Sequence, residues 1–183
     1  ADMPFLSYQP SIEETIKNAG LFLKEGGASA VKLEGGQHIS GHITSLVDCG
    51  IPVLGHIGLT PQSYHQLSGY KIQGKTPGGA QKVIDDALAV QKAGAFGVVL
   101  ECIPTGLAKD ITKKLSIPTI GIGSSSHCDG QILVTDDMLG LSNFSPRFVK
   151  RYINLKKIID KCVRSYARDV RLRKFPSLKN VYK

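Results

Sequence analysis

The sequence lacks three features that would each assign it to a familiar class of protein. It has no long uninterrupted apolar run, so we expect a soluble protein with neither a membrane span nor a signal peptide. Its four cysteines include no Cys-x-x-Cys pair, which argues against a zinc site or a disulfide framework and favours a reducing, cytoplasmic location. No Gly-x-Gly-x-x-Gly fingerprint opens a helix after a strand, and GIGSSS is too weak a match to indicate a nucleotide site.

The chain has 183 residues, 42% of them apolar, a size that normally forms one domain with a sizeable core. Its net charge of +8 would suggest nucleic-acid binding, but the charge is not spread evenly along the chain. Residues 146–183 carry thirteen Lys or Arg against two Asp, a net +11, whereas the preceding part carries ten against thirteen, a net −3. The basic character therefore belongs to the C-terminal segment.

Helical and strand patterns alternate along most of the chain. We expect helices at residues 12–25, 39–50, 80–93 and 107–115, and strands at residues 1–6, 30–33, 51–57, 96–104, 117–123 and 131–135. Such alternation predicts parallel βαβ units, and the apolar runs VVL and IPTIGIG suit strands that are buried on both faces. An open doubly wound sheet and an incomplete barrel both fit six strands, which are two short of a closed eight. The first strand starts abruptly at Ala1, so we expect the native chain to have something upstream.

The segment AVKLEGG at residues 30–36 places two charged side chains at the end of a strand. Lys32 and Glu34 are two residues apart and therefore point to the same face, just before Gly35 and Gly36 turn the chain out of the strand. Burying such charges costs several kcal/mol unless they are paired or hold a metal or substrate, which indicates a site. The alternative is a solvated edge strand with an incidental ion pair.

Other polar residues, Asp2, His56 and Glu101, also fall at or just past the C-terminal ends of strands. Barrels and doubly wound sheets both build their sites at these ends. Carboxylates there suit Mg²⁺, whose remaining positions a 2-oxo acid could fill. Positive charge at that point would stabilise an enolate formed by proton removal next to the carbonyl. His56 is either a second base or hydrogen-bond donor, or a structural residue.

Two further segments invite a functional interpretation. Residues 58–79 form a long polar loop with Tyr64, His65 and Tyr70, which favours a lid or binding loop over disorder. Residues 146–174 predict one long basic helix that packs on the domain through an apolar stripe. An interface helix in a homo-oligomer and an RNA-binding helix are the alternatives, although no RNA motif accompanies it.

Seven motifs within residues 1–140 occur together and in order: DMPF, VKLEGG, GIPVLGHIGLTPQS, GYKIQGK, VLECIP, IPTIGIG and CDGQILV. In this respect the sequence resembles the ketopantoate hydroxymethyltransferase family of pantothenate and coenzyme A synthesis. The resemblance implies a (β/α)₈ TIM barrel of the phosphoenolpyruvate/pyruvate superfamily, assembled as a cytoplasmic homo-oligomer, typically a decamer. It also implies transfer of a hydroxymethyl group from 5,10-methylenetetrahydrofolate to 3-methyl-2-oxobutanoate, giving 2-dehydropantoate.

The same resemblance implies a role for each candidate residue. Asp2 resembles a Mg²⁺ ligand that also borders the oxo acid, and Lys32 resembles the residue that binds this substrate. Glu34 is similar to a second acid on the metal side, acting directly or through water. Glu101 is similar to the proton acceptor, and His56 lies near the substrate pocket with the least defined role.

One departure from the family pattern bears on domain organisation. The family's barrel begins with two further βα units, the second ending in a Gly-Asp-Ser motif that supplies a Mg²⁺ ligand, and nothing in the sequence matches them. We therefore expect residues 1–183 to form a single, N-terminally incomplete barrel domain, with helix 146–174 packed on it and activity dependent on the missing units. The alternatives are a carbon–carbon lyase or mutase of the same superfamily, or a non-catalytic assembly module with a nucleic-acid-binding tail.

Overall fold

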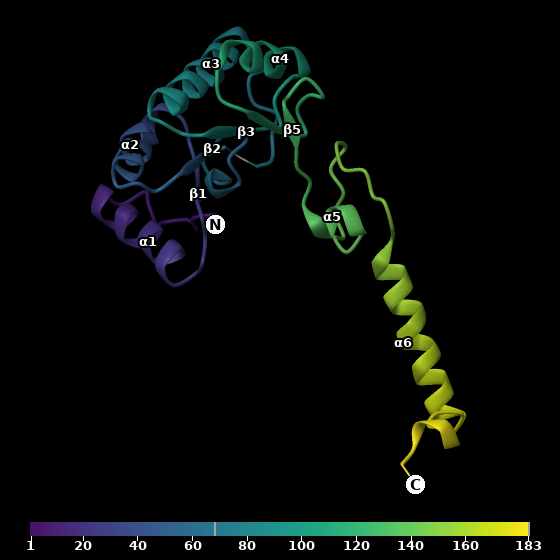
Figure 1. Cartoon of the computed structure of the whole chain (residues 1–183). Helices are drawn as coiled ribbons and strands as arrows, with labels where there is room; N and C mark the ends of the chain where they lie inside the picture. The colour runs from purple at the N-terminus through teal and green to yellow at the C-terminus, as the bar shows by residue number, and fades with distance from the viewer. Residues whose placement is uncertain (68, 183) are drawn as a thin grey trace. The chain divides into compact units, whose positions relative to one another are not determined.

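A parallel β-sheet forms the centre of the computed structural model, which describes residues 1–67 and 69–182 (Figure 1). Its five strands are β1 (Val31–Glu34), β2 (Val53–Gly58), β3 (Gly97–Glu101), β4 (Thr119–Ile122) and β5 (Gly130–Gln131). They pair in sequence order, β1-β2-β3-β4-β5, and every pairing is parallel. A doubly wound sheet reverses its strand order at a switch point, whereas a barrel wall runs in sequence. The strand order therefore favours the barrel over the open sheet.

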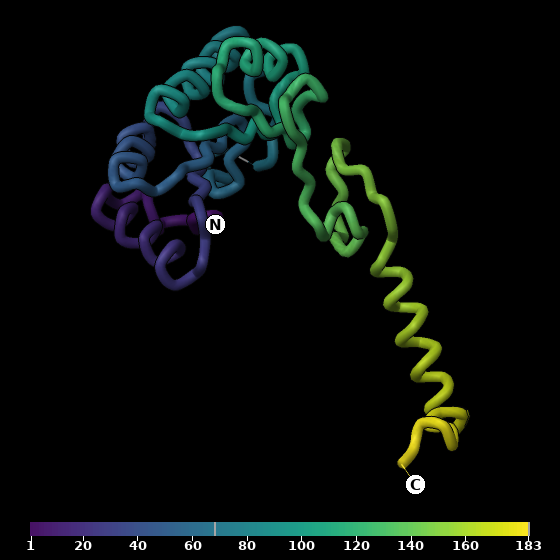
Figure 2. Tube along the Cα trace, in the orientation of Figure 1, coloured from purple at the N-terminus to yellow at the C-terminus, as the bar shows by residue number. Residues whose placement is uncertain are grey.

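Four helices cover one side of this sheet. They are α1 (Ile12–Lys24), α2 (Ser40–Asp48), α3 (Pro77–Lys92) and α4 (Thr105–Lys114), and they form an arc outside the strands in Figure 1. Local sequence explains where they begin: the Ser11 hydroxyl accepts from the Glu14 N–H, and Thr76 caps α3 in the same way, with Pro77 in the first turn. The backbone trace shows the chain leaving each of β1, β2 and β3 for a helix and returning to the next strand (Figure 2).

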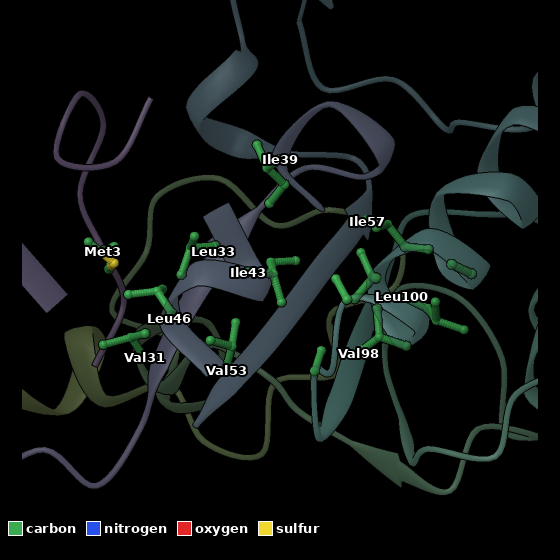
Figure 3. Packing of buried hydrophobic residues seen from close by; sticks show 14 of the residues in the cluster. Met3, Val31, Leu33, Ile39, Ile43, Leu46, Val53, Ile57, Val98 and Leu100 are labelled. Carbon is green, nitrogen blue, oxygen red and sulfur yellow. The ribbon is translucent and has the colours of Figure 1, made fainter. Parts of the chain in front are cut away.

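The hydrophobic core lies between the sheet and these helices. Alternate residues of the strands point into it, and side chains from η1 (Gln37–Ile39) and α2 meet them there (Figure 3). All of these side chains are at most 2% exposed: Val31, Leu33, Val53, Ile57, Val98 and Leu100 from the strands, and Ile39, Ile43 and Leu46 from η1 and α2. Burying each such side chain contributes about 1.5–3 kcal/mol relative to exposure. Because side chains alternate along a strand, the residues between them point to the opposite face of the sheet.

Two predicted strands differ from the structure. Residues 1–6 contribute only a parallel bridge between Asp2 and Lys32, with the Lys32 N–H bonded to the Ala1 carbonyl at 2.7 Å. The strand expected at residues 131–135 is shorter, because β5 ends at Gln131 and helix α5 (Thr135–Leu139) follows. Asp136 and Asp137 lie in the first turn of α5, where negative charge favours a helix start.

The chain divides into two compact units, residues 1–132 and 133–183. The second unit contains α5, the basic helix α6 (Leu155–Arg171) and the short η3 (Leu178–Asn180). The predicted helix 146–174 is therefore too long: Asn154 caps α6 by accepting from the Lys157 N–H at 3.1 Å. A single barrel domain over residues 1–183 and the packing of the basic helix on it stay predictions. No helix among the described residues has the length and apolarity needed to cross a bilayer.

Candidate functional site

The register of the sheet places the five predicted site residues on one face, opposite the core. Lys32 and Glu34 alternate with the buried Val31 and Leu33 along β1. His56 on β2 is the partner of Glu34, and Gly58 is the partner of Glu101 on β3. The bridge between Asp2 and Lys32 adds the fifth residue to the same row.

Lys32 is the centre of this cluster. Its Nζ lies 3.0 Å from Asp2 Oδ1, 3.1 Å from His56 Nδ1 and 3.7 Å from Glu34 Oε1. Only 21% of the lysine side chain is exposed, so the ammonium group depends on these neighbours for the hydrogen bonds that water would otherwise supply. β1 is an edge strand of the described sheet, as the alternative interpretation has it, but the Lys32 and Glu34 side chains are largely shielded from water.

His56 connects Lys32 to Glu101 through its two ring nitrogens. Nε2 lies 2.9 Å from Glu101 Oε2 and 3.0 Å from the Leu59 carbonyl oxygen, while Nδ1 faces the Lys32 ammonium group. A lysine can only donate and a carbonyl can only accept, so these partners assign the ring proton to Nε2. Nδ1 thus accepts from the lysine, and the Nε2–H donates to the Leu59 carbonyl with Glu101 Oε2 also close to it. The side chains of His56 and Glu101 are only 6% and 12% exposed.

Glu34 is the most deeply buried acid of the group, with 4% of its side chain exposed. Its Oε2 accepts a hydrogen bond of 2.9 Å from the Gln62 N–H, and its Oε1 faces Lys32 at 3.7 Å and His56 at 4.0 Å. A buried carboxylate needs such partners, since an unpaired one would cost several kcal/mol.

Tyr8 and Gln62 contact Glu34 directly, and the sequence patterns predict a role for neither residue, although Gln62 lies in the motif GIPVLGHIGLTPQS. The Tyr8 hydroxyl lies 3.0 Å from the Glu34 carbonyl and 3.1 Å from the Glu34 N–H. Burial, the largest cause, raises the pKa of Tyr8 to about 12, although the hydrogen bond with the Glu34 backbone opposes the rise. Gln62 lies in the short 3₁₀ helix η2 (Pro61–Ser63) within the predicted loop.

The carboxylates differ in what they could offer a metal ion. Among residues 1–67 and 69–182, no three His, Cys, Asp or Glu side chains gather as a metal-binding group. The Asp2 side chain is 56% exposed and engages Lys32 through Oδ1. Glu34, by contrast, is buried: its Oε2 accepts from the Gln62 N–H, and its Oε1 faces Lys32 Nζ at 3.7 Å. Of the two predicted metal residues, Asp2 is thus the one whose surroundings leave room for a direct ligand bond.

The long polar loop borders the site and contains an aromatic cluster. The Tyr64 ring centroid lies 5.5 Å from that of His65 and 5.0 Å from that of Tyr70. A cavity of about 300 Å³ separates the loop from α3, lined among others by Gly58, Gly74 and Lys82. Ser68, which belongs to the predicted loop, lies outside the described residues. A lid or binding role for this loop stays a prediction.

Comparison with known proteins gives the site its context. The family described as Ketopantoate hydroxymethyltransferase matches residues 1–178. The chain belongs to this family. It is 53% identical over 184 residues to the 3-methyl-2-oxobutanoate hydroxymethyltransferase of Clostridium beijerinckii, covering 100% of this chain and 67% of that protein. The enzyme of the same name from Geobacter sulfurreducens is 57% identical over 177 residues, covering 96% of this chain and 66% of that protein.

The chain therefore spans about two thirds of the length of these curated relatives. Among solved structures, a dihydrodipicolinate synthase from Oceanobacillus iheyensis matches 65% of this chain and 41% of its own, with 16% identity and a TM-score of 0.41. That similarity is too low to support an argument. Family membership and the sequential parallel sheet confirm the expected fold class, the TIM barrel of the phosphoenolpyruvate/pyruvate superfamily.

Proposed function

We propose that the protein is a hydroxymethyltransferase that converts 3-methyl-2-oxobutanoate to 2-dehydropantoate, with 5,10-methylenetetrahydrofolate as the one-carbon donor. The observation that carries this proposal is the continuous contact from Lys32 through His56 to Glu101 on one face of the sheet. The relatives' name supports the same chemistry and favours it over the lyase, mutase and binding-module alternatives. A cytoplasmic homo-oligomer, typically a decamer, is part of the proposal.

Glu101 is the proposed proton acceptor at C3 of the oxo acid. Its Oε2 lies 2.9 Å from His56 Nε2, so the imidazole limits where the carboxylate can move. A general base needs this kind of fixed orientation within hydrogen-bond reach of the proton that it removes. His56 therefore acts on the reaction by orienting the base as well as by bordering the substrate.

Lys32 is the proposed cationic partner of the substrate. Removing the C3 proton leaves negative charge on the keto oxygen, and an ammonium group that is already fixed stabilises this charge without reorganising. Asp2 and His56 hold the Lys32 Nζ at 3.0 and 3.1 Å, so its position is set before the substrate binds. The enolate carbon then forms a bond to the methylene carbon of the folate, both bonds from that carbon to the folate nitrogens break, and one water supplies the hydroxyl oxygen of the product. Tetrahydrofolate leaves, and the C3 proton together with the two water hydrogens ends on the product hydroxyl and the two folate nitrogens.

The residues present fit a Mg²⁺ ion with Asp2 as a direct ligand and Glu34 acting through water, since Mg²⁺ commonly binds one or two carboxylates and keeps several waters. A bound Mg²⁺ would supply Lewis-acid polarisation of the keto group. The positive charge of Lys32 offsets part of the negative charge of Asp2 and Glu34, because its ammonium group lies within ion-pair distance of both carboxylates.

The test is Glu101→Gln in the intact protein. The amide matches the carboxylate in shape and keeps an oxygen next to His56 Nε2, so the fold should be retained while the base is lost. Turnover should fall by about 10²–10⁴-fold, the usual contribution of a general base. Glu25→Gln, at the exposed C-cap of α1, is the matched control and should leave turnover unchanged. Wild-type turnover in Glu101→Gln would show that the assigned base is wrong.

A further inference from the structure

Two uncharged residues, Tyr8 and Gln62, hydrogen-bond to Glu34 in addition to its charged neighbours, Tyr8 to the backbone and Gln62 to the carboxylate. We call this pair the bracket; the Tyr8 hydroxyl lies 3.1 Å from Gln62 Oε1. Tyr8 is 1% exposed, and its hydroxyl bridges the Glu34 N–H and the Glu34 carbonyl. The backbone of Glu34 is therefore fixed from one side by a single buried phenol.

Gln62 completes the bracket with both its side chain and its backbone. The side-chain Oε1 accepts from Gln9 Nε2 at 3.3 Å and competes with the Glu34 carbonyl for the one proton of the Tyr8 hydroxyl, and Nε2 donates to the Met3 carbonyl at 2.8 Å. These contacts hold the turn of η2, whose Gln62 N–H then points at Glu34 Oε2. One glutamine thus ties together the loop, the strand that carries Glu34 and the segment that carries Asp2.

We infer that Gln62, together with Tyr8, is a positioning residue for the reaction, acting through the Glu34 carboxylate on the Lys32 ammonium group. This inference rests on the proposed function. Lys32 Nζ lies between Asp2 and Glu34, so a rotation of the Glu34 carboxylate changes the balance of charges that sets where the ammonium group rests. The enolate charge develops only in the transition state, so a displaced Lys32 lowers kcat more than it raises KM.

The experiment compares Gln62→Met with Gln81→Met in the intact protein. Methionine matches glutamine in length and removes every polar contact of the side chain, while the backbone N–H of residue 62 stays. Gln81 is exposed on α3, away from the cavity lining, and among the described residues its side chain donates only to Asp85, at 2.8 Å, which makes it the control. We expect kcat to fall about tenfold or more in Gln62→Met, with KM for the oxo acid within twofold, and Gln81→Met to behave as wild type.

A second background separates positioning from simple loss of structure. In Glu34→Gln, the added Gln62→Met change should cost little more, because its effect passes through the carboxylate that is already gone. Equal losses in both backgrounds would overturn the inference and leave the proposed function intact. Full activity of Glu34→Gln would instead contradict the role of Glu34 in the proposed function.

A spectroscopic measurement tests the bracket independently of turnover. ¹³C labelling of the glutamate side-chain carboxyls gives one resonance for each glutamate, and Glu34→Gln identifies the one from Glu34. This resonance should shift or broaden in Gln62→Met and in Tyr8→Phe but not in Gln81→Met. An unchanged Glu34 resonance in both bracket variants would refute the inference even if the protein does not turn over the oxo acid.

Discussion

Gly58 ends β2, two residues after His56 and paired in register with Glu101, the proposed base, and its replacement by alanine should disturb both. The glycine has φ +89°, a conformation that strains residues with a Cβ. An added Cβ would lie 2.3 Å from the Glu101 carbonyl oxygen and 2.8 Å from Ile103 Cγ2. The Leu59 N–H donates to the same Glu101 carbonyl at 2.9 Å, so this oxygen cannot move freely.

The magnitude of the effect follows from these two terms. The positive φ costs a non-glycine residue about 1–2 kcal/mol, and overlap in a packed region adds about 1–3 kcal/mol. We therefore expect Gly58→Ala to lower the free energy of unfolding by about 2–5 kcal/mol. Relieving the overlap requires the backbone of β2 or β3 to shift by about 1 Å, and a misplacement of that size can reduce a rate about 10²-fold.

Urea denaturation and turnover of the oxo acid measure the two effects in the intact protein. Gly41→Ala is the control, because a Cβ at this exposed position in α2 meets nothing within 4 Å. This control should be neutral or stabilised by about 0.5–1 kcal/mol, the usual gain from replacing glycine in a helix. A Gly58→Ala protein with wild-type stability and turnover would refute the reasoning about β2 and β3.

Two further predictions concern buried ionisable groups. Because burial raises the pKa of Tyr8 from its ordinary 10.0 to about 12, the folded protein keeps a proton that the unfolded chain loses. Its contribution to stability is complete below pH 10 and is lost as the pH rises toward 12, so the urea midpoint should fall more between pH 9 and pH 11 in wild type than in Tyr8→Phe. Equal falls in the two proteins would contradict this. Burial, assisted by the charge of Glu101, raises the pKa of the Cys102 thiol to about 11, so iodoacetamide at pH 8 should modify the exposed Cys49 well before Cys102, as followed by mass spectrometry. Equal labelling rates at these two cysteines would show that the end of β3 is open to solvent.

The parts of the site that could be predicted from the sequence share one property, namely that they lie at strand ends with strong local patterns. Lys32 and Glu34 were assigned to one face by their spacing, and Glu101 by its place after an apolar run. The structure brings both groups together with His56, as the positions of parallel strand ends predict.

The parts that could not be predicted depend on contacts between distant segments. Tyr8 and Gln62 are 54 residues apart, and neither lies in a periodic pattern, so no local signal connects them to Glu34. The sequence also does not predict the start of α6 after its cap Asn154, because the apolar spacing of Phe148 and Tyr152 extends the helical pattern toward the N-terminus. The Asn154 side chain marks the helix start only once the folded backbone brings the Lys157 N–H within hydrogen-bond distance of it.

Residue spacing is enough to predict which side chains share a face of each strand, and the Ser11 cap is enough to predict the start of α1, because both follow from backbone geometry over a few residues. The starts of α3 at Pro77 and α4 at Thr105 precede the predicted positions 80 and 107. Contacts between distant segments place His56 opposite Glu34, bring His56 Nε2 to 2.9 Å from Glu101 Oε2, and let Gln62 reach Glu34 and Met3 at once. Strand order and register depend on how all the apolar faces pack together, and no local stretch of the chain contains that information.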